Sequence, residues 1–380
     1  MSSCHSITLV CGYKRRCQRS SGLFVIRLPR RIKSLDFDEF QPPVPESHMS
    51  FPIIKKTDMS SVKWSYSPAL DQLRFFAAGL VCLNHYRGFN NIPDTDNIFL
   101  RIFYHIEKQG SFGVSIFLVL SAFLFTMNCR GGRRPIQYSV FIKKRIARIF
   151  PMYIIIMLLL MTQIRGTWTV LDFLTFLFMQ VNTGNLMTGF GHAFLPIGPI
   201  WTIGVEFQFY LIFPLLIAAL PTTRLPRLIL FISVFIVLRV LLGLWSLGAA
   251  SYYNCYHTLL GRADQFMIGI ICAELYMRYG NRINKNQALL ILISTLPIIV
   301  FYMQVFNPIS YPFNAFSFTL EALLSGGVIC SLQILRGLKG ILGTGIANLG
   351  KISYSFYLLH LPGLCCTNGK DSPSQPILVM

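Results

Sequence analysis

Long apolar runs dominate the chain after residue 65, and short polar or basic stretches separate them. Nearly all of these runs approach the length of about 20 residues that a helix needs to cross a bilayer. They cover residues 70–86, 110–127, 149–163, 168–182, 199–220, 227–246, 264–279, 287–306, 314–335 and 345–366. The pattern predicts an all-α integral membrane protein, a bundle of about ten transmembrane helices.

The run at residues 168–182 is short and contains Asp172. If it is re-entrant, nine helices span the membrane and the basic residues of the later loops fall mostly on the side of the amino terminus. Because lysine and arginine are enriched in cytosolic loops, the distribution of charge favours nine spans with a cytosolic amino terminus. Ten spans stay the alternative at this point.

The composition is typical of a multi-pass membrane protein and excludes an ordinary soluble domain. Hydrophobic residues make up 53% of the 380 positions and charged residues only 13%, with a mean hydropathy of +0.54. The net charge of +19 comes from basic residues in the tail and in loops beside apolar runs. Membrane lipids explain this charge better than nucleic acid does. Ten scattered cysteines indicate neither a disulfide framework nor a metal site.

The two ends of the chain differ from its apolar centre. Residues 1–65 are basic and rich in serine and proline, which predicts a mostly disordered cytosolic tail without a cleaved signal peptide. Met49 and Met59 are alternative starts of a shorter protein. Residues 367–380 are polar, so the helix before them is expected to be truncated.

The first apolar run, Leu70 to Tyr86, carries three ionisable residues, Asp71, Arg74 and His85. In a helix, Arg74 and His85 return to nearly the same face, about 16 Å apart along the axis. Ionisable groups at membrane depth cost several kcal/mol unless they are paired or hydrated, so this face is expected to line a functional crevice. The alternative is that Arg74 and His85 are anchors at the two membrane interfaces.

A basic stretch leads into the third apolar run with the pattern R-x-x-R-x-x-P-x-Y, formed by Arg145, Arg148, Pro151 and Tyr153. The two guanidinium groups are one helical turn apart and suit bidentate binding of phosphate. Anchoring on the cytosolic side of the membrane explains them equally well.

Polar residues in the later runs are further candidates. Glu206 follows Trp201 in an apolar run and needs a cation or a proton. It either pairs with Arg74, tunes His85, or joins two helices without a chemical role. Arg262 opens another run, as an anchor or a ligand contact.

The final run has a polar side, formed by Tyr354, Tyr357 and His360. These motifs, taken together and in this order, resemble the acyltransferase 3 family of membrane O-acyltransferases. The matching segments are the LDxLR context of Arg74 with His85, FGVSIFLVLSAFL, R-x-x-R-I-x-P-x-Y, WTIGVE with FYLIFP, RADQFMIG and ISYSFYLLH. The domain similar to the family is placed at residues 66–366.

The resemblance implies ten membrane helices, which we prefer to the nine favoured by charge. It also implies transfer of an acyl group, often acetyl from coenzyme A, to a hydroxyl of a carbohydrate such as a cell-surface polysaccharide or lipid-linked glycan. Its catalytic pair maps onto Arg74 and His85. Gln72, Phe75 and Ala122 stand where the family commonly has glycine.

These residues support a mechanism in which His85 is the general base for the acceptor hydroxyl. Arg74 would stabilise the oxyanion or hold a donor phosphate, with Asp71 orienting it. Arg145 and Arg148 would bind the phosphates of acyl-CoA, and Tyr153 belongs to the same motif.

Alternatives to direct transfer also arise from the sequence. Ser121 or His85 could carry a covalent acyl group. Glu206, Trp201, Arg262 and the final-run residues Tyr357 and His360 complete the candidate site. A flippase for a lipid-linked glycan and an inactive, truncated homologue are the competing functions. We expect a location in the plasma membrane, with membrane lipids and the carbohydrate acceptor as the partners.

Overall fold

All regular secondary structure in the described part of the chain is helical, as the sequence predicts. A computed structural model describes residues 66–85, 97–163, 170–182, 200–220, 225–245, 255–305 and 314–367, which belong to one unit of the chain. The predicted tail at 1–65 and nearly all of 367–380 lie outside these ranges. The helices are α1 (Pro68–His85), α2 (Ile98–Lys108), α3 (Phe112–Asn128), α4 (Tyr138–Gln163), α5 (Val170–Leu177), α6 (Trp201–Ala219), α7 (Leu225–Trp245), α9 (Leu259–Tyr279), α10 (Lys285–Val305), α11 (Asn314–Leu335), α12 (Gly340–Lys351) and α13 (Ser353–Thr367).

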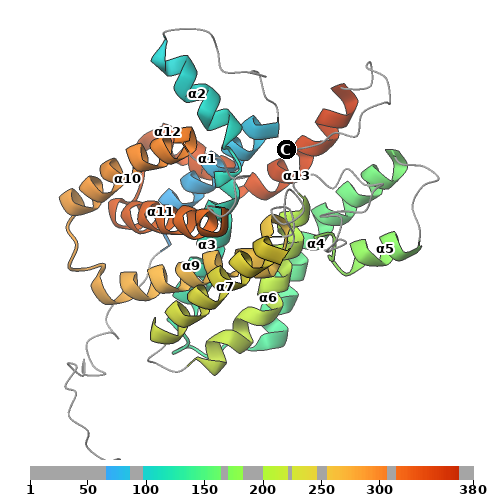
Figure 1. Ribbon diagram of the computed structural model, residues 1–380, viewed down its shortest axis with the longest axis horizontal. Helices are drawn as coiled ribbons and strands as arrows, with labels where there is room; N and C mark the ends of the chain where they lie inside the picture. The colour runs from blue at the N-terminus through green and yellow to red at the C-terminus, as the bar shows by residue number, and fades with distance from the viewer. Residues whose placement is uncertain are drawn as a thin grey trace, which may run out of the picture. The chain divides into compact units, whose positions relative to one another are not determined.

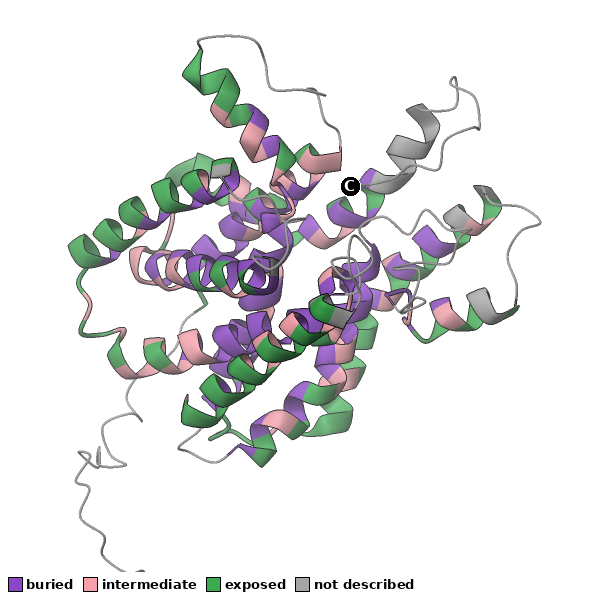
Figure 2. Ribbon diagram, in the orientation of Figure 1, coloured by how far each residue is buried: buried purple, intermediate pink, exposed green. Residues whose placement is uncertain are grey.

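Helix α3 is the centre of the packing and contacts α1, α9 and α11 (Figure 1). Nearly all of its residues are buried, because they are apolar or small on every side. A Cβ atom added at Gly113 would overlap the carbonyl oxygen of Ala77, so glycine allows α1 and α3 to approach closely. The result is a buried centre between these helices, seen in Figure 2.

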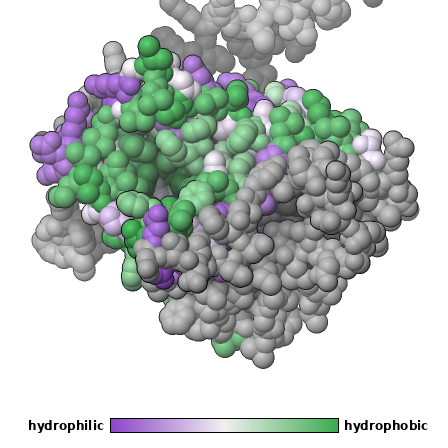
Figure 3. Space-filling model, turned by 90° about the horizontal axis from the view of Figure 1, so that it is seen from above, coloured by the Kyte–Doolittle hydropathy of each residue, from purple (hydrophilic) through white to green (hydrophobic). Residues whose placement is uncertain are grey.

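The helices around this centre expose large apolar side chains. Leu215 on α6, Leu230 on α7, and Leu290 and Phe301 on α10 are each more than 60% exposed. Figure 2 shows exposed residues along the outer sides of α7 and α10, and Figure 3 shows hydrophobic residues spread over one face of the protein. Such surfaces suit lipid rather than water.

Four helices among the described residues, α6, α7, α10 and α11, are long and apolar enough to cross a membrane. A fifth span arises if α2 and α3, which are bent by 58° at their junction, form one broken span. The chain is therefore a multi-pass membrane protein. These four or five candidate spans neither confirm nor contradict the predicted total of ten.

Three segments differ from the sequence prediction. Helix α2 forms where we expected only a polar connection, and Asn97 caps it by accepting a hydrogen bond of 2.9 Å from the amide of Phe99. Within the run 168–182, α5 has only eight residues, about 12 Å, which is too short to span. The predicted helix 345–366 is broken at Ile352 into α12 and α13.

Helix α12 packs along α1 and holds its first turns in place. The Gln72 amide donates to the carbonyls of Leu338 and Gly343 at 2.9 and 2.8 Å, and its oxygen accepts from the Leu338 amide at 2.8 Å. A Cβ atom added at Gly350 would overlap the carbonyl oxygen of Asp71. Gln72 therefore joins α1 to the turn that precedes α12 and to the first turn of α12 itself.

Candidate functional site

A pocket with a volume of about 840 Å³, part of it continuous with solvent, lies between α1, α3, α4, α6 and α13. Three arginines, Arg74, Arg145 and Arg148, line it together with one carboxylate, Glu206. The other lining side chains are apolar, hydroxyl-bearing or phenolic. The excess of positive charge makes this pocket suited to an anionic ligand.

Arg74 enters the pocket from the start of α1 and is held by two neighbours. Its guanidinium donates to Asp71 Oδ1 and to the Tyr66 hydroxyl, both at 2.7 Å, and Tyr66 donates to the same Asp71 oxygen at 2.6 Å. Asp71 is one turn before Arg74 and is only 3% exposed, so its carboxylate is a fixed partner. This geometry matches the orienting role that the sequence suggests for Asp71.

Arg145 and Arg148 reach the pocket from α4, one helical turn apart. The Arg145 guanidinium lies over the rings of Phe125 and Phe141, with its carbon 4.9 and 5.5 Å from their centroids. Within the described ranges, the buried Nε of Arg145 has no hydrogen-bond partner. The aromatic contacts fix Arg145 at the wall of the pocket.

Glu206 lies in the same pocket and accepts a hydrogen bond from the Ser121 hydroxyl, which joins α6 to α3. Arg74 shares the pocket, but the ion pair that it forms is with Asp71. Two further pocket residues, Thr202 and Tyr210, lie four positions before and after Glu206, so they share its helix face. Sequence reasoning missed both, although this spacing could have revealed them.

Hydroxyl groups of α6 and α13 also line the pocket. The hydroxyls of Thr202 and Tyr357 are hydrogen-bonded at 2.8 Å. Tyr354 also lines the pocket and donates to the carbonyl of Ile149 at 2.9 Å, which joins α13 to α4.

His85 is not among the residues that line this pocket. It is the last residue of α1, about 16 Å along the helix axis from Arg74. Its ring lies 5.1 Å from that of His360, which in turn lies 5.6 Å from the ring of Tyr357. The structure thus separates the two residues of the predicted pair, and Tyr357 and His360 lie between His85 and the pocket.

Besides Asp71, which reaches the pocket only through Arg74, three more predicted residues lie outside the pocket lining. Tyr153 is buried and donates to the carbonyl of Phe176 at 2.9 Å, which ties α4 to the end of α5. Trp201 and Arg262 contact each other, with the guanidinium carbon 5.7 Å from the Trp201 ring centroid. These contacts give all three residues a role in helix packing.

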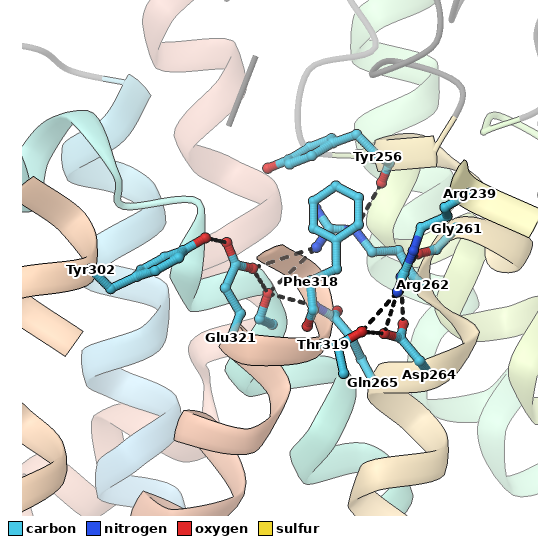
Figure 4. A network of polar contacts seen from close by, with 11 residues as sticks. Arg239, Tyr256, Gly261, Arg262, Asp264, Gln265, Tyr302, Phe318, Thr319 and Glu321 are labelled. Atoms are coloured by element: carbon cyan, nitrogen blue, oxygen red, sulfur yellow. Dashed lines mark hydrogen bonds and ion pairs between the residues drawn. The ribbon is translucent and has the colours of Figure 1, made fainter. Parts of the chain in front are cut away.

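Arg262 belongs to a second polar network, buried between α3, α9, α10 and α11 (Figure 4). Its guanidinium lies between the rings of Tyr256 and Phe318, 4.2 and 3.9 Å from their centroids, and 3.6 Å from the Glu321 carboxylate. Glu321 also accepts hydrogen bonds from Tyr302, at 2.8 Å, and from Ser115. The network connects helices that are distant in sequence.

Beside this network, Arg239 of α7 and Asp264 of α9 form a bidentate ion pair at 2.9 and 2.8 Å (Figure 4). The two side chains are 1% and 0% exposed. Because a charge left alone in such a place is strongly unfavourable, each partner depends on the other.

We expect Asp264→Leu to lower the free energy of unfolding by about 3–5 kcal/mol, because it leaves Arg239 buried and uncompensated. Thermal unfolding of the purified protein in detergent measures the loss. The double variant Arg239→Met, Asp264→Leu should recover most of it.

The matched control is Glu274→Leu on the same helix. Glu274 pairs with Arg278 at 3.3 Å, and these side chains are 13% and 28% exposed. Its loss should cost less than about 1 kcal/mol. Equal destabilisation by Asp264→Leu and by the double variant would contradict the mutual dependence of Arg239 and Asp264.

The described residues contain no group of three histidine, cysteine or acidic side chains placed to hold a metal ion. The candidate site consists of the arginine pocket and of the histidine pair beyond Tyr357.

Comparison with known proteins gives the family. The model of a family described as "Acyltransferase domain", acyltransferase 3, matches residues 67–368. A protein of Komagataeibacter xylinus named "Putative membrane-bound transacylase BcsY" is 25% identical over 278 residues, 69% of this chain and 68% of that protein.

Proteins of Staphylococcus aureus strains COL and MSSA476, each named as a "Putative O-acetyltransferase", are 22% identical over 293 residues. The alignment covers 68% of this chain but 47% of theirs, so the chain spans about half the length of these relatives. No solved structure matches the chain. The family match covers the whole described helical region, and the chain belongs to the acyltransferase 3 family of membrane acyltransferases.

Proposed function

We propose that this protein transfers an acyl group, acetyl in the simplest case, from acyl-CoA to a hydroxyl of a carbohydrate. The observation that carries the proposal is the convergence of Arg74, Arg145 and Arg148 on one pocket. Coenzyme A is a polyanion with a long, uncharged arm that ends in the thioester. A basic pocket that is also lined by neutral hydroxyl groups suits such a donor.

Arg145 and Arg148 bind the donor phosphates. Guanidinium groups form short, charge-assisted hydrogen bonds to phosphate oxygens. Arg145 is held by aromatic rings and has a buried Nε donor without a partner in the described part of the protein. Arg74 is already paired with Asp71, so it supplies a hydrogen-bond donor rather than a full net charge.

The thioester end of the donor passes Thr202 and Tyr357 to reach His85, which acts on the acceptor there. The acceptor oxygen attacks the thioester carbon, its proton moves to His85, and the new C–O bond replaces the C–S bond. The proton passes to the departing sulfur, which gives an ester and a free thiol. A neutral imidazole suits this step because its ordinary pKa lies near physiological pH.

The acceptor is a cell-surface polysaccharide or lipid-linked glycan, at the plasma membrane. The family and the O-acetyltransferase names of the S. aureus relatives support an O-linked product. The basic start of α4 favours a cytosolic position for Arg145 and Arg148, on the side where acyl-CoA is made. In the ten-span arrangement α1 also crosses the membrane, and a cytosolic amino terminus then puts His85, at the end of α1, toward the opposite face, near an exported acceptor.

The test uses the purified full chain in proteoliposomes with radiolabelled acetyl-CoA and surface polysaccharide stripped of its esters. We expect thiol release that requires the polysaccharide, and label that mild alkali removes from it. Thiol release without labelled polysaccharide, or no release with any hydroxyl acceptor, would refute the proposal.

A further inference from the structure

Two aromatic side chains of α13 connect the donor pocket to His85. Tyr357 lines the pocket, and its ring meets the ring of His360 at 65° and 5.6 Å. The His360 ring meets the ring of His85 at 64° and 5.1 Å. Both distances lie in the normal range for edge-to-face aromatic pairs. The three rings therefore form a continuous series from the pocket wall to His85.

The two imidazoles have the same hydrogen-bond pattern. Nδ1 of His85 is 2.8 Å from the carbonyl oxygen of Val81, and Nδ1 of His360 is bonded to the carbonyl oxygen of Tyr357. A carbonyl only accepts hydrogen bonds, so in a neutral ring the hydrogen is on Nδ1 and the lone pair is on Nε2. In His85, Nε2 is therefore the nitrogen that takes a proton.

Burial separates the roles of the two histidines. His360 is 7% exposed, whereas His85 is only half-buried at the last residue of α1. A half-buried side chain at a helix end keeps rotamer freedom unless a neighbour removes it. His85 is thus the residue that a substrate can reach, and His360 is the fixed surface against which its ring rests.

We propose that His360 is a positioning residue for His85: its ring, seated against Tyr357, holds the His85 imidazole in the orientation that receives the acceptor proton. This inference rests on the transfer reaction proposed above. The contact is made by the faces and edges of the rings, so an aromatic ring is what position 360 must supply. Misplacing a catalytic group by about 1 Å can cost about 100-fold in rate.

Three substitutions at position 360 distinguish the contribution of the aromatic ring from that of its nitrogens. His360→Phe keeps a ring, His360→Leu keeps apolar volume only, and His360→Asn keeps a donor near the position of Nδ1. With acetyl-CoA and ester-free surface polysaccharide, the Leu and Asn variants should lower kcat by about 10–100-fold and leave the KM for acetyl-CoA unchanged. The Phe variant should restore most of the lost kcat, at equal membrane amounts.

A second readout does not depend on acyl transfer. Diethyl pyrocarbonate modifies accessible imidazole nitrogens, and peptide mass spectrometry follows the modification of His85 over time. His85 should react faster in the Leu and Asn variants than in the wild type, whereas the Phe variant should match the wild type. If the wild type transfers no acyl group, the proposed function fails, but this modification rate still tests the contact.

Several results would overturn the role of His360. A Phe variant as slow as the Leu variant would show that a nitrogen of His360 is required. An Asn variant with the wild-type rate would show that only the hydrogen bond from position 360 to the Tyr357 carbonyl matters, and not the ring. Wild-type kcat and wild-type modification of His85 in the Leu variant would remove the role altogether.

Discussion

We expect His85→Ala to abolish acyl transfer while the amount of protein in the membrane stays unchanged. General bases contribute about 10²–10⁴-fold to rates, so the loss of kcat should reach the limit of detection in an assay of acceptor-dependent thiol release. Stability should change little, because His85 is half-buried at the end of α1 and its hydrogen bond is to Val81 of the same helix. Binding of coenzyme A should be retained, since His85 does not line the arginine pocket.

Two comparisons sharpen the His85 experiment. His105→Ala on α2 is the matched control, because it removes a partly exposed imidazole that has no place in the mechanism, and it should keep wild-type transfer. His85→Gln keeps a polar side chain of similar length but offers no basic nitrogen. An exporter of a lipid-linked glycan would tolerate this change, whereas an acyltransferase would be crippled. Full activity of His85→Gln would therefore point to transport.

We expect Arg148→Ala to raise the KM for acyl-CoA by about 10- to 100-fold and to have a smaller effect on kcat. A hydrogen bond to a charged group contributes about 1.5–3 kcal/mol, and each 1.4 kcal/mol corresponds to a factor of ten in affinity. Arg148 is exposed on α4 and lines the pocket, so its removal should leave the fold intact. Initial rates over a range of acetyl-CoA concentrations measure the change.

Lys144→Ala is the control for loss of charge on the same helix. Lys144 is exposed, as Arg148 is, but it does not line the pocket. Its removal should leave the KM for acetyl-CoA within the small range expected of a screened surface charge. Equal increases in KM for the two variants would assign the effect to general attraction of the anion. A pure fall in kcat for Arg148→Ala would contradict its role in donor binding.

The sequence predicts the helical class and the family well, because long apolar runs and ordered motifs are local features. Prediction of the helix boundaries from the sequence fails where polar and apolar residues are mixed. Helix α2 was interpreted as a polar connection because Arg101, His105 and Lys108 lower its mean hydropathy, although they share one face of an amphipathic helix. The break at Ile352 between α12 and α13 also lies in a mixed stretch, since Asn348, Lys351 and Ser353 interrupt the apolar residues there.

The candidate site was predicted in part. The contact of Asp71 with Arg74 follows from their spacing on one helix, and the arginines of α4 were found by their motif. The separation of His85 from the pocket does not follow from α1 alone, because the packing of α13 against it decides which residues lie between. Likewise, the contacts of Gln72 reach a turn 266 residues away in the sequence.

The central claim is that one membrane protein forms an ester on a surface carbohydrate and uses His85 to do so. Mass spectrometry of ester-linked acyl groups on the surface polysaccharide tests it in three strains: intact, lacking the protein, and carrying His85→Ala at verified membrane levels. The account predicts that the ester disappears in both altered strains and returns when the wild-type chain is supplied. An unchanged ester content in the strain that lacks the protein would contradict the account.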